Sequence, residues 1–427
     1  MKKTAKSLFL ITFICLSNLV FGQFVANYDE SKVPEYSLPE LLVLENGKKV
    51  KTAGVWENKR RPEILELFQN EVFGKVPDVS YELSFQVIKD NIEAINGKAI
   101  LKEVEITVST SEGKLPINVL FFIPKSNKPV PLFLTLNFYG NQSIHPDKNI
   151  SLAKSWLRNN EEFGITENKS NEATRGVRAY RWEVEEIIDN GLALATIYYG
   201  DIDPDFDDGF KNGIHGILKD DSDGNKNDNW GSIAAWAWGL SRAMDYIVTD
   251  ADFDKDKVAV MGHSRLGKAA LWAGATDKRF ALTISNDSGC GGAALSRRKF
   301  GETVWRINDS FPHWFCGNFK KYSDQESNLP VDQHMLIALM APRAIYVASA
   351  EDDQWADPRG EYLSTYYGSQ VYKLFNEKAL SEQKMPNIES PVVASKVGYH
   401  IRKGKHDVTP YDWQQYISFA RSCFGLQ

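Results

Sequence analysis

The stretch from Val258 to Ala275 constrains the fold more than any other part of the chain. It reads Val-Ala-Val-Met-Gly-His-Ser-Arg-Leu-Gly-Lys-Ala-Ala-Leu-Trp-Ala-Gly-Ala. Its first four residues have the length of a buried parallel strand, and small and apolar residues favour a helix from Lys268 onward. A serine in the tight turn between them is typical of a nucleophile elbow. The pattern is G-x-S-x-x-G, because the second glycine is Gly267, and an ordinary turn with Ser264 as helix N-cap is the alternative interpretation.

Strands and helices alternate along the rest of the chain, which favours a doubly wound α/β architecture. Alternating apolar residues predict an antiparallel pair at 100–108 and 115–123, and buried strands are expected at 132–138, 192–199, 280–285, 344–348 and 393–399. Helices are expected at 61–73, 182–189, 233–248, 331–340 and 410–424. The strand at 132–138 runs into residues 137–141, where such a fold places an oxyanion-hole loop.

The sequence therefore predicts an α/β-hydrolase fold, a three-layer sandwich with a mostly parallel central sheet and helices on both faces. We expect one domain over residues 23–427, with an N-terminal wrap at 23–80 and a polar insertion at about 142–180. Residues 1–22 have the features of a signal peptide, because Lys2, Lys3 and Lys6 precede an apolar run too short to span a membrane. The mature protein is expected to be secreted or periplasmic, with no membrane partner.

Charge and cysteine content exclude other classes. A net charge of −6 without a basic stripe argues against nucleic-acid binding. Cys290, Cys316 and Cys423 remain beyond the expected leader; they are compatible either with one disulfide and a spare thiol or with buried small side chains. No metal-type spacing such as C-x-x-C occurs, so no metal is expected. The acidic segment near Asp221 only faintly resembles a calcium loop, and a solvated loop is the preferred interpretation.

The order of a serine elbow, an acid after a late strand and a histidine in the last loop is that of α/β-hydrolases. A serine hydroxyl becomes a good nucleophile only when an imidazole removes its proton and a carboxylate orients that imidazole. Of the seven histidines, only His400 and His406 come late enough in the chain to serve as the base. His406 is favoured because it lies on a glycine-containing loop before the final helix, whereas His400 is expected within a strand.

The run from Gly262 to Lys268 resembles the G-x-S-R-x-G-K signature of the glucuronoyl esterases, carbohydrate esterase family 15. Further matches are Asn286–Ala294, Glu302, Asp353–Pro358 and His406, and the resemblance extends from about residue 132 to the C-terminus. Members of this family cleave the ester between lignin alcohols and the 4-O-methyl-glucuronic acid of glucuronoxylan. The resemblance implies a secreted serine esterase that needs no cofactor and acts on lignin–carbohydrate esters. We expect a monomer, although the sequence has no feature that fixes the oligomeric state.

The same resemblance implies roles for individual side chains. Ser264 is the expected nucleophile, His406 the base and Arg265 an oxyanion stabiliser, and the expected sugar-binding residues are Lys268, Glu302 and Trp355.

The acid is left open. The family supplies it after either of two strands, and this chain has a carboxylate at each place, Asp287 and Asp353, with Asp352 and Glu351 as neighbours that could substitute. The chain also lacks the disulfide that some members form beside the nucleophile, because it carries His263 and Lys405 there.

Three other functions fit the sequence less well. An acetyl xylan esterase or general carboxylesterase of the same fold would have no use for the charges of Arg265 and Lys268 beside the nucleophile. A non-catalytic polysaccharide-binding protein would not need a serine, a histidine and two candidate acids in this order. A serine peptidase of this fold is the third alternative, although the chain has no appended propeller that would gate access.

Overall fold

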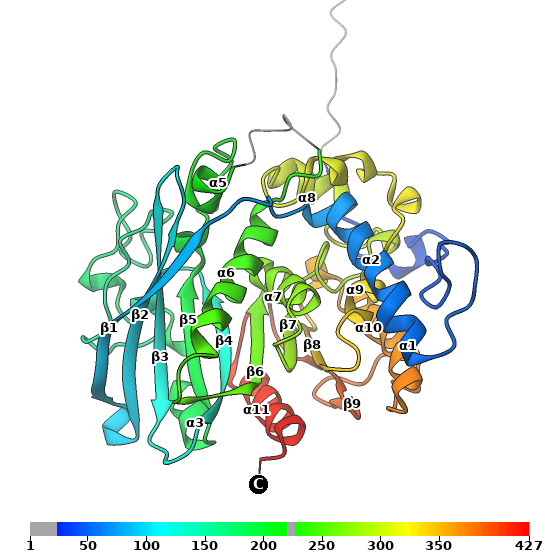
Figure 1. Ribbon diagram of the computed structural model, residues 1–427. Coiled ribbons are helices and arrows are strands. Elements are labelled where there is room, and N and C mark those ends of the chain that lie inside the picture. Colours follow the sequence, from blue (N-terminus) through cyan, green and yellow to red (C-terminus); the bar gives the residue numbers. More distant parts are fainter. Residues whose placement is uncertain (1–23, 220–226, 427) are drawn as a thin grey trace, which may run out of the picture.

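A ten-stranded mixed sheet runs through the part of the chain that the computed structural model describes, residues 24–219 and 227–426 (Figure 1). The expected signal peptide and the acidic segment near Asp221 lie outside these residues. The strand order is β1-β2-β3-β5-β4-β6-β7-β8-β10-β9. The strands are β1 Glu82–Ala94, β2 Ala99–Ser109, β3 Lys114–Pro124, β4 Val130–Asn137, β5 Ala193–Tyr198, β6 Phe253–His263, β7 Leu282–Asn286, β8 Ala344–Ala350, β9 Val392–Ala394 and β10 Val397–Arg402.

The centre of the sheet is parallel and its edges are antiparallel. Strands β5, β4, β6, β7, β8 and β10 pair in parallel, so their carboxyl ends share one edge of the sheet. Strands β1 to β3 form the expected antiparallel meander, and β3 pairs antiparallel with β5. The single strand expected at 393–399 is wrong: the chain turns at Ser395, whose φ is +52°, and β9 folds back on β10.

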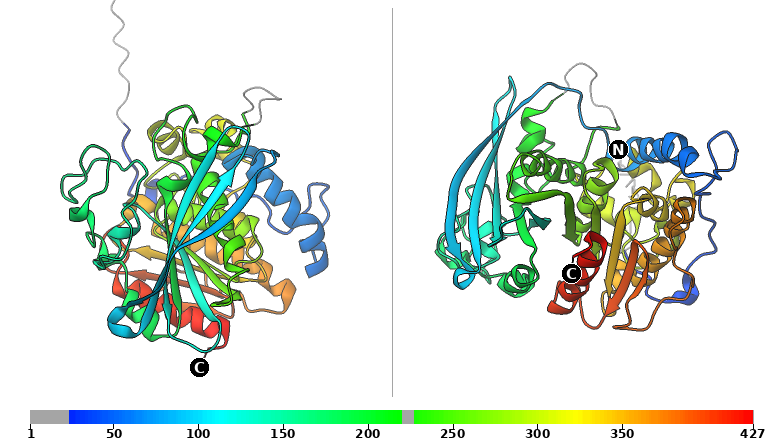
Figure 2. Two further views of the ribbon diagram at one scale, coloured as in Figure 1. Left: turned by 60° about the vertical axis from the view of Figure 1, so that its left-hand side comes forward. Right: turned by 60° about the horizontal axis from the view of Figure 1, so that its bottom comes forward.

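Helices cover both faces of the sheet, which confirms the predicted α/β-hydrolase fold (Figures 1 and 2). Alternate residues of β6 enter opposite layers: Val258 and Val260 belong to one apolar core, and Ala259 and Met261 to the other. The first core packs against α2, α6, α7, α9 and α10, the second against α3 and α11. The helices are α1 Ala53–Val55, α2 Arg61–Phe68, α3 Val184–Asp189, α4 Tyr199–Ile202, α5 Gly213–Ile217, α6 Ser232–Ile247, α7 Arg265–Thr276, α8 Val304–Ser310, α9 Gln333–Ala338, α10 Pro358–Ser369 and α11 Pro410–Phe424.

Two segments outside this sandwich lie near the carboxyl edge of the sheet. The N-terminal segment is tied down by Glu30, whose carboxylate pairs with Arg298 at 2.6 Å. Residues 142–180, the teal loops in Figure 2, contain short 3₁₀ turns and two isolated antiparallel bridges. They return to the start of the segment through a hydrogen bond from the Gly176 N–H to the Gln142 carbonyl, 2.8 Å. Within the described ranges, no helix has the length and apolarity needed to cross a membrane.

Candidate active site

The turn between β6 and α7 has the strained geometry of a nucleophile elbow. Ser264 has φ +59° and ψ −130°, a conformation that a non-glycine residue seldom adopts. Its side chain makes no capping hydrogen bond, so the alternative of a simple N-cap serine does not hold. A Cβ at Gly262 would lie 1.9 Å from the Leu266 carbonyl oxygen, and a Cβ at Gly267 would lie 3.0 Å from the Gly262 oxygen. The late second glycine therefore still allows the close approach of helix and strand.

One cleft of about 780 Å³, open to solvent, collects every site residue expected from the sequence. Four of them follow the carboxyl ends of parallel strands, where loops from distant parts of the chain converge. Ser264 follows β6, Asp287 follows β7, Asp353 follows β8 and His406 follows β10. The remaining members of the expected set are Arg265, Lys268, Glu302 and Trp355.

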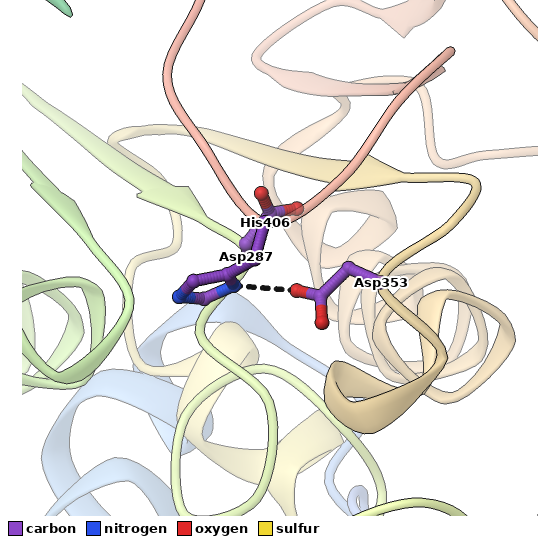
Figure 3. A group of neighbouring side chains, drawn as sticks. All are labelled: Asp287, Asp353 and His406. Atoms are coloured by element: carbon purple, nitrogen blue, oxygen red, sulfur yellow. Dashed lines mark hydrogen bonds and ion pairs between the residues drawn. The ribbon is translucent and has the colours of Figure 1, made fainter.

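The imidazole of His406 is bound by Asp353. Its Nδ1 lies 2.6 Å from Asp353 Oδ2, and this hydrogen bond is the dashed line in Figure 3. The carboxylate is buried, while the His406 side chain is 42% exposed. This bond leaves Nε2 as the nitrogen available to the cleft. The Ser264 hydroxyl makes no hydrogen bond to His406 here, and such contacts in ligand-free enzymes are often long and shorten with substrate.

Asp287 lies beside this pair but contacts the backbone of the histidine loop. Its Oδ2 is 3.4 Å from the Asp407 N–H and 3.4 Å from Arg402, while its Oδ1 has no hydrogen-bond partner in the part of the chain that the structure describes. Burial raises the pKa of Asp287 well above its usual range, and the negative charges of Glu361 and Asp353 raise it further against the opposing effect of Arg402. The neutral form of Asp287 is therefore favoured beside the His406–Asp353 pair.

Asp287, Asp353 and His406 could also be considered as metal ligands. One donor atom from each lies within 4.8 Å of the others. The His406 Nδ1 is already bonded to Asp353, and one of the two carboxylates favours its neutral form, so this donor set suits an oriented imidazole better than a divalent cation.

Arg265 is held by an acid that sequence reasoning missed. Its guanidinium forms an ion pair with Asp205, and Asp205 also accepts hydrogen bonds from His313 at 2.9 Å and from the Trp314 indole at 2.8 Å. The Nε–H of Arg265 is buried without a hydrogen-bond partner among the described residues. Asp205 belongs to the acidic loop after β5. The signal that could have identified it is the alternation of Asp201, Asp203 and Asp205 just beyond a strand end, since all three are buried.

A second group of polar side chains lies deeper in the cleft. Lys268 Nζ is 4.0 Å from Glu302 and donates to the Ser288 carbonyl at 2.5 Å. Burial lowers the pKa of Lys268 and raises that of Glu302, while the attraction between the two opposes both shifts. The Glu302 N–H donates to the Trp355 carbonyl at 3.0 Å, and the Trp355 side chain is left 38% exposed. These groups can offer hydrogen bonds and an apolar face to a polyhydroxylated ring.

Other expectations are settled by burial and contacts. His400 is a strand residue in β10, fully buried and 2.9 Å from Asp412, as expected. Cys290, Cys316 and Cys423 are free, and the first two are buried. The loop at 137–141 does not line the Ser264 cleft; residues 137–139 line a neighbouring pocket instead.

His263 occupies the place beside the nucleophile. Its ring lies 4.5 Å from the His406 ring at an angle of 40°, and its Nδ1 is 2.6 Å from Asn286 Oδ1. Burial, with a further contribution from His406, holds the pKa of His263 well below its usual range. A neutral ring therefore packs against the histidine of the cleft.

Comparisons with known proteins agree with this geometry. A family model for fungal glucuronyl esterases matches residues 224–376. Carbohydrate esterase MZ0003, from an unknown prokaryotic organism, is 54% identical over 396 residues, which cover 92% of this chain and 91% of that protein. The solved structure of a promiscuous CE15 esterase from the marine bacterial metagenome is 53% identical with a TM-score of 0.88, covering 93% of this chain and all of that one.

A glucuronoyl esterase from Solibacter usitatus is 46% identical with a TM-score of 0.86, and the match covers 92% of this chain and 100% of that structure. Identity at this level over nearly the whole length of both chains identifies a family as well as a fold. The chain belongs to carbohydrate esterase family 15, the glucuronoyl esterases, which are carboxylic ester hydrolases.

Proposed function

We propose that this protein is an exported serine esterase that hydrolyses the ester between 4-O-methyl-D-glucuronic acid of glucuronoxylan and lignin alcohols. The observation that carries the proposal is the composition of one cleft. A serine on a strained elbow, a histidine bonded to a buried aspartate and a buried lysine–glutamate pair all line it. The first three groups suit acyl transfer, and the lysine–glutamate pair suits the hydroxyls of a sugar.

The reaction begins with proton transfer. His406 Nε2 takes the proton of the Ser264 hydroxyl as its oxygen attacks the ester carbonyl carbon. Asp353 holds the proton on Nδ1, which leaves Nε2 free as the base, and stabilises the imidazolium that forms. The tetrahedral intermediate collapses when His406 gives the proton to the departing alcohol oxygen. Water, activated by the same imidazole, then releases the glucuronate from the acyl-enzyme and restores Ser264.

Two kinds of donor are placed for the oxyanion. The N-terminus of α7 directly follows Ser264, and the helix dipole favours negative charge there; the Gly267 and Lys268 N–H groups donate to the Ser264 carbonyl, so the backbone donors for the oxyanion are those of Arg265 and Leu266. Arg265 adds a fixed positive charge, and its Nε–H has no hydrogen-bond partner within residues 24–219 and 227–426. Asp205 fixes the guanidinium before substrate arrives, so little reorganisation is needed when the charge develops.

The acyl half of a glucuronate ester is the sugar itself, because the scissile carbonyl is attached directly to the ring. Lys268 and Glu302 are buried close to Ser264 and would exchange hydrogen bonds with ring hydroxyls, while Trp355 would pack beside the ring. An acetyl group would leave the lysine–glutamate pair without ligands. A site built for hydroxyls rejects such an analogue strongly.

A broader carboxylesterase is the second candidate function. It is favoured by one finding, that a relative 53% identical to this chain is described as promiscuous. The two candidates differ in how much of the rate depends on the sugar hydroxyls, so substrate comparison separates them.

The deciding experiment measures kcat/KM for benzyl glucuronate, benzyl galacturonate and an aryl acetate. A glucuronoyl esterase should prefer the glucuronate to the acetate by at least about 10²-fold. Lys268→Ala should reduce this preference far more than it slows acetate hydrolysis. Ser264→Ala and His406→Ala, checked for folding by circular dichroism, should each lower turnover by about 10³-fold or more. Equal rates on glucuronate and acetate would refute the proposed substrate and leave a general esterase.

A further inference from the structure

A buried glutamate that the proposed mechanism does not use lies behind the catalytic cleft. Glu361, on α10, is fully buried and is not among the residues that line the cleft. Its Oε1 accepts hydrogen bonds from the Ser288 N–H at 2.8 Å and the Gly289 N–H at 2.9 Å, and its Oε2 accepts one from the Ser349 hydroxyl at 2.6 Å. Burying a carboxyl group is costly, and here the cost is offset mainly by bonds to the turn that follows β7.

The turn that Glu361 holds, residues 287–289, directly follows β7 and lines the cleft. The backbone has positive φ at Asp287 and Gly289, +45° and +59°, and its two successive N–H groups converge on one oxygen, as in the backbone nests that bind anions. Ser288 and Gly289 are both buried. An apolar side chain at position 361 would therefore leave two N–H groups without an acceptor, a cost that favours another conformation of the turn.

The same turn presents a carbonyl group to Lys268. The Ser288 oxygen accepts a hydrogen bond from Lys268 Nζ at 2.5 Å, and this buried ammonium lies 4.0 Å from Glu302. The Ser288 carbonyl and the Gly289 N–H belong to one planar trans peptide unit, so they point in opposite directions. The bond from that N–H to Glu361 therefore aims the carbonyl at the lysine on the other side.

We propose that Glu361 is a positioning residue for Lys268, acting through the Ser288–Gly289 peptide, and that it thereby sets the preference for sugar esters. The inference rests on the proposed glucuronoyl esterase function, in which Lys268 binds ring hydroxyls. An ammonium has three N–H donors, and the fixed Ser288 carbonyl takes one of them. The other two are then directed towards Glu302 and towards the hydroxyls of a bound sugar.

The test compares kcat and KM for benzyl glucuronate and for an aryl acetate in the wild type and in Glu361→Met. Methionine is flexible and similar in length, but it offers no comparable acceptor. The variant should lose about tenfold in kcat/KM on benzyl glucuronate, mostly as a higher KM, as expected when one hydrogen bond to a charged group is misplaced. It should lose less than about twofold on the acetate, which has no hydroxyls for Lys268 to bind. An equal loss on both esters would show a general structural role and would overturn the proposal.

A double-mutant cycle tests the route through Lys268. In the Lys268→Ala background, adding Glu361→Met should lower kcat/KM on benzyl glucuronate by less than about twofold, because the group that Glu361 positions is gone. A further loss of about tenfold would mean that Glu361 acts by another route, and would overturn the proposal.

Two further substitutions separate the acceptor from the packing of α10. Glu361→Gln keeps an oxygen in place of Oε1, and its amide can donate to the Ser349 hydroxyl, so the preference for the glucuronate should stay within about threefold of wild type. Thr365→Val is the matched control, because Thr365 is buried on the same helix and donates only to the Glu361 carbonyl, at 2.7 Å. This control should leave the preference unchanged. A loss in Thr365→Val as large as in Glu361→Met would assign the effect to the helix and overturn the proposal.

Glu361→Asp replaces Glu361→Met if thermal melting shows that the methionine variant is not folded. The shorter side chain withdraws the acceptor from both N–H groups but keeps a carboxyl, and it should lower the preference by about threefold or more. An unchanged preference in a folded Glu361→Asp, or one that survives in a folded Glu361→Met, would overturn the positioning role while the glucuronoyl esterase function stands. Equal kcat/KM on both esters in the wild type would overturn that function and the inference with it.

Discussion

Replacing each of the two candidate acids by asparagine should have very different effects. Asp353→Asn removes the negative charge bonded to His406 Nδ1 at 2.6 Å. A full charge pair about 4 Å apart, at an effective dielectric of 20, is worth about 4 kcal/mol. Losing that stabilisation of the imidazolium corresponds to about 10³-fold in kcat, and the wrong tautomer of the imidazole can add a further factor of about ten.

Asp287→Asn should lower kcat by less than about threefold. Burial and the charges of Glu361 and Asp353 raise the pKa of Asp287, so its side chain favours the neutral form that asparagine reproduces in size and shape. Its contacts with Asp407 and Arg402 are long, 3.4 Å each. The double variant should therefore behave like Asp353→Asn alone.

The assay is steady-state hydrolysis of benzyl glucuronate between pH 5 and 9, with thermal melting to confirm that each variant is folded. Ser264→Ala provides the background rate. The reasoning is refuted if Asp287→Asn loses 10³-fold while Asp353→Asn remains within tenfold of wild type. Full activity of the double variant would direct attention to Asp352 or Glu351.

Three other predictions follow from buried or paired groups. His263→Ala should lower kcat about tenfold with little change in KM, because it removes the ring packed 4.5 Å from His406, and His263→Phe should recover part of the loss; unchanged kcat in His263→Ala would contradict this role. Burial lowers the pKa of His334 to about 4, whereas in the unfolded chain this imidazole takes up a proton near pH 6.5. The free energy of unfolding should therefore fall by about 3 kcal/mol as the pH drops from about 6.5 to about 4. Urea unfolding at pH 7 and 4.5 should show a smaller pH dependence of this free energy in His334→Gln than in the wild type, and an equal pH dependence in both would disprove the prediction. Dialysis against EDTA should leave kcat unchanged, because His406 Nδ1 is hydrogen-bonded to Asp353 and not to a metal. Loss of activity that only added metal restores would show that these three side chains bind a metal ion.

The sequence by itself determined the parts of this protein that depend on local pattern. An apolar run, a glycine-flanked serine and a helix-forming segment specify the elbow within residues 258–275, because each is a property of neighbouring residues. The elbow forms although the second glycine comes one residue late, because Gly267, in the first turn of α7, still lies close to the Gly262 carbonyl oxygen. Chain order then placed His406 after the last strand. The buried strands β4 and β8 could be read from the continuous apolar runs at 132–138 and 344–348, although β4 itself is Val130–Asn137. The hairpin at 392–402 was missed because a turn at a serine with positive φ has no strong sequence signal.

Only the tertiary structure shows which of the two candidate acids contacts the histidine. Asp287 and Asp353 each follow the carboxyl end of a strand, and these strands, β7 and β8, are parallel neighbours. A sequence pattern of strand followed by acid therefore cannot distinguish them. What separates them is the side chain that each meets across the edge of the sheet: Asp353 reaches an imidazole 53 residues away, and Asp287 reaches a backbone N–H and Arg402. The ion pair between Arg265 and Asp205 could not be predicted for the same reason, because Asp205 lies 60 residues away in an acidic loop. Burial and pairing between distant loops are set by how the layers pack, and no local pattern of residues encodes them.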